Sequence, residues 1–150
     1  MPEKQTVERA LRAKREGKSP STQAGEFVRE EIHHVREGKH GARSAKQAIA
    51  IGLSKARRAG VKLKPPKKGK ASAETRRRAQ SDFRAGQRGS KAKPSLRRSR
   101  ATLEALRHEG HQAASSEALA RQAHLSSSRR SAAARSASAK KAAETRSAQE

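Results

Sequence analysis

The sequence has few of the residues that build a large hydrophobic core. Leu, Ile, Val and Phe together number 17 among 150 residues, well below the roughly 20% under which a highly charged chain is expected to be disordered. Trp and Tyr are absent, and most of the 31% hydrophobic content is alanine, which buries little area. This composition disfavours a sheet-based enzyme and a deep small-molecule cleft.

Cysteine is also absent, which excludes disulfide frameworks, thiolate nucleophiles and cysteine-based zinc sites. No stretch approaches the roughly 18 apolar residues of a membrane span, and no apolar run follows Met1 to Gln5 as in a signal peptide. We therefore expect a soluble cytoplasmic protein without a membrane partner, and we expect the mature protein to be the whole chain.

Charge is abundant and has mainly one sign. The chain has 37 Lys and Arg against 14 Asp and Glu, a net charge of +23. Most of the large apolar residues precede residue 64, whereas most of the basic residues follow it. This asymmetry predicts a small helical module over residues 1–63, a Pro/Lys linker over 64–71 and a basic low-complexity tail over 72–150.

Three segments of the module end in glycine, at Gly17, Gly38 and Gly60, where a left-handed residue would close a helix. The first helix is expected from Thr6 to Glu16. The spacing therefore predicts three short helices.

The second and third helices have recognisable starts. The second is expected after Pro20, capped by Ser21 or Thr22, and the third opens with a capping box of Ser44 and Gln47. The expected core joins an apolar stripe of the second helix to residues that follow it: Val28, Ile32 and Val35 against Ile49, Leu53 and Val61. Because it has so few large side chains, the module is expected to be only marginally stable by itself. A homodimer through these helices is one assembly that would stabilise it.

The tail carries helix signals without an apolar face. Ser72 could cap a helix ending at Gly86, and Ser95 another ending at Gly110; both are expected to be transient and unpacked. Residues 126–143 are almost wholly Ser, Ala, Arg and Lys. The predicted fold is mainly α: a small, marginal three-helix N-terminal module followed by a largely disordered basic Ser/Ala/Arg/Lys-rich tail.

Such a cationic chain suits nucleic acid, because each basic side chain can neutralise a phosphate and release condensed counterions. Without Trp or Tyr, base-stacking readers of single strands are unlikely. A helix-turn-helix reading of the second and third helices is disfavoured, because the connection is long and the third helix is rich in Ala and Ile. The predicted nucleic-acid-binding residues are Lys46, Lys55, Arg57, Arg58, Lys62, Lys64, Lys67, Lys68, Lys70, Arg76, Arg77, Arg78, Arg97, Arg98, Arg100, Arg129, Arg130, Lys140 and Lys141.

No catalytic, cofactor or metal site is predicted. His33, His34 and His40 are close in sequence, and His108 and His111 lie far from them. His33 and His34 are adjacent, so in a helix they point about 100° apart and cannot easily bind one ion. Exposed histidines on a solvated face are the simpler interpretation for this group. Glu30 and Glu31 lie between Arg29 and Arg36, which should keep the pKa values of both carboxyls low. Glu26 with Glu30, and Arg29 with His33, are expected to be helix-surface charges.

The segment from Lys18 to Leu63 contains the motif KQAIAIGLSKARRAG, beginning at Lys46. Through this motif it resembles a family of small basic bacterial proteins known as a domain of unknown function. The resemblance implies a bacterial source and a helical module; the family has no established activity or functional residues. The tail is similar in composition to linker-histone-like bacterial proteins.

These observations together predict a non-enzymatic, nucleoid-associated (histone-like) protein. It would bind phosphate backbones mostly independently of sequence, with duplex DNA as the favoured partner. An RNA- or ribosome-associated basic protein is one alternative, and a protein-interaction module with a solubilising tail is another. The expected location is the cytoplasm, at the bacterial nucleoid.

Overall fold

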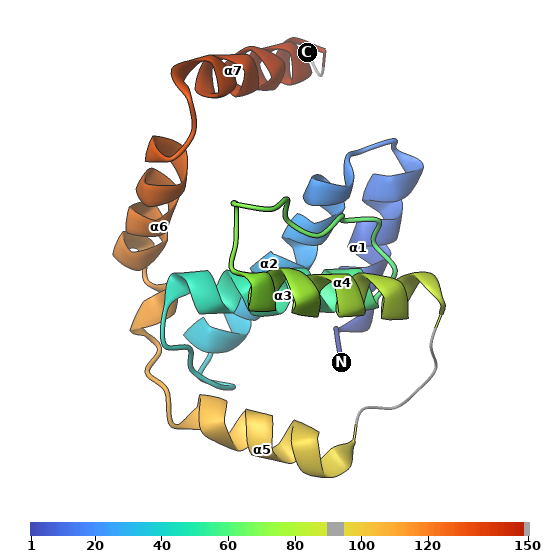
Figure 1. Cartoon of the computed structure of the whole chain (residues 1–150), viewed down its shortest axis with the longest axis vertical. Helices are drawn as coiled ribbons and strands as arrows, with labels where there is room; N and C mark the ends of the chain where they lie inside the picture. Colours follow the sequence, from blue (N-terminus) through green and yellow to red (C-terminus); the bar gives the residue numbers. More distant parts are fainter. Residues whose placement is uncertain (90–94, 149–150) are drawn as a thin grey trace. The chain divides into compact units, whose positions relative to one another are not determined.

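A computed structural model describes residues 1–89 and 95–148, and the regular structure in these ranges is helical (Figure 1). The helices are α1 (Lys4–Arg15), α2 (Pro20–Arg36), α3 (Ala45–Arg58), α4 (Ala73–Gln87), α5 (Leu96–Arg107), the 3-10 helix η1 (Gln112–Ala114), α6 (Ser116–Ser128) and α7 (Ala132–Ser147). The β structure within these ranges is a single bridge between Lys68 and Ala71. The prediction of a mainly α protein is confirmed.

The prediction of a largely disordered tail is wrong for its described residues, which form α4 to α7. Ala, Arg and Lys favour the helical state intrinsically, and serines stabilise two of the helix starts. Ser72 Oγ accepts a hydrogen bond from the amide of Thr75 at 3.1 Å, and Ser131 Oγ accepts one from the amide of Ala134 at 3.2 Å. The Ser/Ala/Arg/Lys-rich composition of the tail, which provides few large apolar side chains for a core, is therefore sufficient to form helices.

The three helices predicted for the module are present, and their predicted ends are confirmed. Gly17, Gly38 and Gly60 have φ angles of +71°, +73° and +92°, the left-handed conformation in which glycine carries no Cβ penalty. Helix α1 begins at Lys4, two residues before the predicted Thr6.

The helix starts differ in detail from the prediction. Helix α2 is capped by Ser19 rather than by Ser21 or Thr22, because Pro20 occupies the first helical position, where a missing N–H costs nothing. Ser44 caps α3 as predicted, and its Oγ accepts from the amide of Gln47 at 3.1 Å. In a capping box the Gln47 side chain would accept the backbone amide of Ser44. Here Gln47 Oε1 accepts the amide of the preceding residue, Arg43, at 2.7 Å.

Helix α2 packs against α1 and α3, and α3 packs in turn against α4. The hydrophobic core contains Phe27 with small residues around it: Ala10, Ala24, Ala56 and Val61. Within the predicted stripe Ile32 and Val35 are buried, whereas Val28, Ile49 and Leu53 are half-buried. Gly52 explains the close contact of α2 and α3, because a Cβ there would lie 2.6 Å from the Val28 Cα.

The tail helices differ in how they pack. Helix α4 continues past Gly86, its predicted end, and packs against α3, so the expectation of an unpacked helix is wrong here. Helix α5 follows Ser95 as predicted, but it ends at Arg107 before Gly110 and buries none of its residues.

The chain forms two compact units, Met1–Ser115 and Ser116–Glu150. The first contains α1 to α5 and η1, and the second contains α6 and α7. The predicted boundaries at residues 63 and 71 stay a prediction. No helix in residues 1–89 and 95–148 has the length and apolar character needed to cross a membrane.

Candidate functional site

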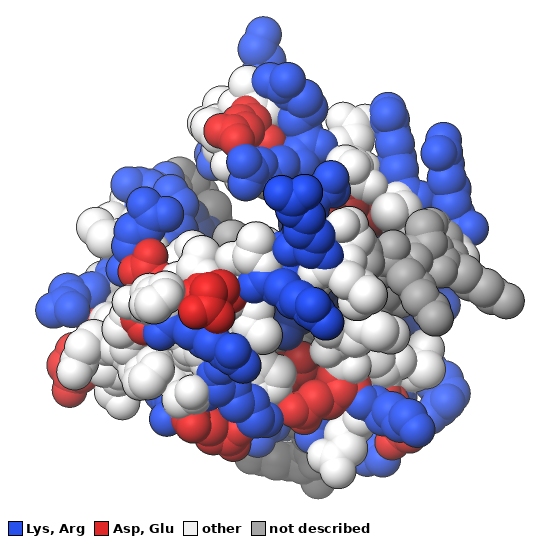
Figure 2. Space-filling view, turned by 90° about the horizontal axis from the view of Figure 1, so that it is seen from below, with Lys and Arg blue, Asp and Glu red and all other residues white. Residues whose placement is uncertain are grey.

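Most of the predicted nucleic-acid-binding residues lie on the surface. On the face shown in Figure 2, Lys and Arg side chains project at many places, and Asp and Glu are interspersed among them. The exposed candidates are Lys46, Arg58, Lys62, Lys64, Lys67, Lys68, Lys70, Arg77, Arg78, Arg97, Arg98, Arg100, Arg129, Arg130, Lys140 and Lys141, and Arg76 is half-buried. Two of them are in ion pairs, Arg58 with Asp82 at 3.5 Å and Arg78 with Glu74.

Two of the predicted residues, Lys55 and Arg57, are directed into the protein. Lys55 contacts buried carboxylates, as described below, and Arg57 donates from Nε to the carbonyl of Leu63 at 3.2 Å. Burial lowers the pKa of the Arg57 guanidinium, while the charge of Asp82 opposes that effect. Both cations are engaged in contacts within the first unit, and their part in nucleic-acid binding stays a prediction.

Arginines gather on one side of α4. Arg77, Arg84 and Arg88 line an open groove together with Gln80, Ser81 and Ala85. The spacing of seven and then four residues places the three arginines on one helical face. The opposite face contains Ala79, which is buried, and Gly86.

Helix α4 is fixed to α3 by specific contacts. Ser54 Oγ donates to Asp82 Oδ2 at 2.6 Å, and a Cβ on Gly86 would lie 1.8 Å from the carbonyl oxygen of Arg57. The backbones are thus in direct contact at Gly86. The arginine face of α4 is therefore presented outward by a helix whose inner face is anchored.

Helix α3 is poorly placed to read bases. It packs against α2 on one side and α4 on another, and Ala45, Ala48, Gly52, Ala56 and Arg57 are buried. The amide oxygen of Gln47, which could otherwise contact a base edge, accepts the Arg43 amide. These contacts favour a structural role for α3 over a recognition helix.

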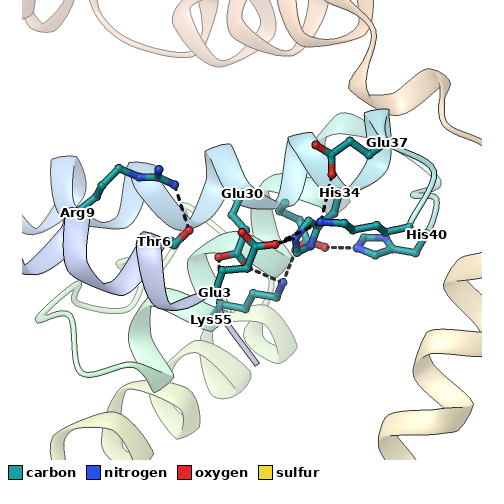
Figure 3. Close-up of polar contacts among 10 residues, drawn as sticks. Glu3, Thr6, Arg9, Glu30, His34, Glu37, His40 and Lys55 are labelled. Atoms are coloured by element: carbon teal, nitrogen blue, oxygen red, sulfur yellow. Dashed lines mark hydrogen bonds and ion pairs between the residues drawn. The ribbon is translucent and has the colours of Figure 1, made fainter.

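The largest departure from the sequence prediction is a buried charge cluster (Figure 3). The side chains of Glu30 and Glu31 on α2 are each only 1% exposed, and Lys55 of α3 lies between them. Lys55 Nζ is 2.6 Å from Glu31 Oε2 and 3.3 Å from Glu30 Oε1. The expectation that Glu30 is a helix-surface charge is wrong, because its side chain is 1% exposed.

Further hydrogen bonds hold Glu30. Its Oε2 accepts the backbone amide of Glu3 at 3.0 Å, which ties the start of α1 to α2. Burial raises the pKa of the Glu30 carboxyl, but hydrogen bonds from Thr6 and from the Glu3 amide, together with the charge of Lys55, outweigh it and lower that pKa. The expected direction was right, but the partners are not Arg29 and Arg36.

Two histidines adjoin the cluster. His40 is buried and its Nε2 lies 3.2 Å from Glu31 Oε1, while His34 Nε2 lies 2.9 Å from Glu3 Oε1. The expectation of exposed histidines holds for His33 and fails for His40. These contacts join residues that sequence reasoning treated as unrelated.

A signal for the buried glutamate was present in the sequence. Glu31 lies four residues after Phe27 and four before Val35, so it shares their face of α2. Both neighbours on that face are almost fully buried. A charged residue on an apolar stripe needs a partner of opposite charge. Lys55, the second lysine of the KQAIAIGLSKARRAG motif, is that partner for Glu31.

Comparison with known proteins bears on the N-terminal part of the chain. Residues 3–68 match the model of a family of unknown function (DUF6496). The resemblance predicted from the motif at Lys46 to Gly60 is thus confirmed. The match includes α1, α2 and α3 and the segment after them, and therefore both Glu31 and Lys55. Comparison with curated proteins and with solved structures gives no match.

Proposed function

We propose that this chain is a non-enzymatic DNA-binding protein of the nucleoid-associated type, which binds phosphate backbones with little sequence preference. The proposal rests on one observation above the others. Arg77, Arg84 and Arg88 share an outward face of a helix anchored to the folded unit, in a chain with a net charge of +23. Each of these arginines can neutralise a phosphate and release condensed counterions, and no carboxylate is among the residues that line their groove.

The anchoring of α4 matters for affinity. Because the helix rises about 1.5 Å per residue, the arginine row from Arg77 to Arg88 spans roughly 16 Å. Arginine pairs with phosphate oxygens through two parallel N–H bonds. A row held by the Ser54 to Asp82 contact loses less freedom on binding than the same residues on a flexible chain.

Little base-specific reading is expected of this surface. A protein recognises a DNA sequence through side chains that reach base edges in a groove. Helix α3 would be the recognition helix of a helix-turn-helix, but it packs against both α2 and α4. The chain has no Trp or Tyr to stack on bases. Sequence-independent binding is the mode that these features support.

The test compares two triple variants of the full chain that remove equal charge. In the first, Arg77, Arg84 and Arg88 become Gln; in the control, Arg12, Lys14 and Arg15, which are exposed on α1, become Gln. Affinity for a random-sequence duplex is measured by fluorescence anisotropy across a salt series. For the unmodified chain, engagement of about 6–10 phosphates would make affinity fall roughly 10³- to 10⁵-fold between about 50 and 200 mM salt.

The α4 variant is expected to lose the contacts of its arginine row, and the slope of log affinity on log salt should become shallower by about 2 to 3. The α1 control should change that slope much less. Equal losses in both variants would remove the α4 face from the proposal. Recovery of a single strong consensus from random duplexes would contradict sequence-independent binding, and a clear preference for RNA of equal length would favour the RNA-associated alternative.

A further inference from the structure

We propose that Glu31, His34 and His40 form a binding site for a divalent transition-metal ion of the zinc class. One ligand atom from each residue lies within 4.8 Å of the other two. In a tetrahedral zinc site with bonds of about 2.0–2.1 Å, donor atoms are about 3.3 Å apart. The Glu31 Oε1 to His40 Nε2 distance of 3.2 Å already matches this spacing.

The local fold brings these residues together from a short stretch of sequence. Glu31 and His34 are three residues apart on α2 and share a face of that helix. The chain then reverses at Gly38, where Gly38 N donates to the Val35 carbonyl and Lys39 N donates to the His34 carbonyl. This is a Schellman motif, and it returns His40 to the last turns of α2.

The segment after the turn is held in place by backbone hydrogen bonds to the end of α5 and the residues that follow it. The Gly41 amide donates to the carbonyl of Leu106 at 2.8 Å, and the Ala42 amide donates to the carbonyl of Gly110 at 3.0 Å. His40 is therefore positioned by backbone contacts on both sides. Ligands held by the fold in this way lose little freedom when an ion binds.

The hydrogen bonds of His40 leave its inner nitrogen available as a ligand. Nδ1 lies 3.0 Å from the carbonyl oxygen of Gly41, and a carbonyl only accepts, so Nδ1 carries the proton. In the neutral ring Nε2 then presents a lone pair to the carboxylate oxygen of Glu31. A proton on Nε2 or a metal ion can join the two atoms, which are 3.2 Å apart, and a backbone carbonyl behind the ring is the usual support of a metal-binding histidine.

His34 has a comparable support. Glu3 Oε1 accepts from its Nε2 at 2.9 Å, which leaves the other ring nitrogen for the ion, as in carboxylate–histidine–metal arrangements. The His34 and His40 rings are edge to face, with centroids 6.0 Å apart. Two imidazoles and one carboxylate without a thiolate are a donor set that zinc accepts.

Charge and access also favour a cation. Glu30 and Glu31 are two buried carboxylates, and Lys55 supplies one positive charge to both. The outer side of the cluster is formed by Glu3 and Lys39, whose side chains are about half exposed, so an ion can enter there without unfolding of the core. An ion at this place would join α2, the turn after it and, through Glu3, the start of α1.

The proposal is tested on the full chain without a histidine tag, after treatment with a chelator. Zn²⁺ is titrated against a chromophoric chelator, and Co²⁺ is added separately, because its visible spectrum reports the coordination geometry. His34→Gln and His40→Gln remove ligands, while His33→Gln is the matched control, since His33 is the exposed neighbour on the same helix. Circular dichroism shows whether each variant keeps its helices.

We expect one Zn²⁺ per chain, at least tenfold weaker binding in His34→Gln and His40→Gln, and binding within about twofold of the original in His33→Gln. If buried His40→Gln unfolds, half-buried His34→Gln still decides the question. Absence of binding at micromolar Zn²⁺, or an equal loss in all three variants, would overturn the proposal. If no Zn²⁺ binds, the contact between His40 and Glu31 is an ion pair without a metal. If all three variants lose affinity equally, the binding is weak and comes from surface histidines.

Discussion

Lys55 Nζ lies 2.6 Å from Glu31 Oε2, and this contact joins α3 to the buried face of α2. The same ammonium group is 3.3 Å from Glu30 Oε1. One lysine thus compensates two carboxylates that are almost completely removed from water. The stability of the first unit should depend on this side chain far more than on Lys46, the other lysine of α3.

Replacing Lys55 by Met keeps an unbranched side chain that is one atom shorter and removes the ammonium group with its charge. Because two carboxylates would then be buried without their cation, we expect the free energy of unfolding to fall by about 3 kcal/mol. The measurement is urea unfolding followed by circular dichroism in the presence of a chelator. Lys46→Met, at an exposed position of the same helix, should change stability by less than about 0.5 kcal/mol.

A second substitution checks that the loss arises from the carboxylates. Adding Glu31→Gln to Lys55→Met removes one of the two unpaired charges, so part of the lost stability should return. Additive losses in the double variant would show that Lys55 and Glu31 do not interact.

The contact of α2 with α3 predicts that Gly52→Ala destabilises the protein. The added Cβ would lie 2.6 Å from the Val28 Cα, and a backbone atom cannot move aside as a flexible side chain does. We expect a loss of about 1–3 kcal/mol in thermal or urea unfolding. Gly25→Ala is the matched control, because it lies in α2 with open space around it; it should stabilise by up to about 1 kcal/mol. Equal effects of the two substitutions would contradict the close packing.

The anchoring of α4 predicts a specific role for Asp82. Asp82→Ala removes the acceptor of Ser54 and the partner of Arg58, so we expect a loss of about 1–2 kcal/mol and faster proteolysis of α4. Glu74→Ala removes the same charge from an exposed position of the same helix. If limited proteolysis does not distinguish the two variants, α4 is not held by this contact.

Local features of the fold were predictable from the sequence because their causes are local. Gly17, Gly38 and Gly60 end helices because only glycine adopts a positive φ at no cost. Ser44 and Ser72 cap helices through bonds to amides three residues away. The same reasoning does not find the Ser19 cap, because Pro20 is itself the first residue of α2 and the cap lies one residue before it.

Burial was harder to predict, since it depends on which helix covers which face. Glu30 and Glu31 were interpreted with their sequence neighbours, but their actual partners are Lys55 and the Glu3 amide, distant in sequence. Nor did the composition reveal that α4 packs closely. Its backbone meets that of α3 at Gly86, and the residue it buries is Ala79; such small residues leave no hydrophobic stripe in the sequence.

The contact between α3 and α4 has a practical consequence for how this protein is divided into fragments. The family match ends at residue 68, yet the first unit continues to Ser115. A fragment cut at residue 68 would expose the backbone of Arg57, where Gly86 packs, and would leave the Ser54 hydroxyl without Asp82. The family match therefore ends inside the first compact unit, and an expression fragment of the N-terminal region that is to keep these contacts has to include α4.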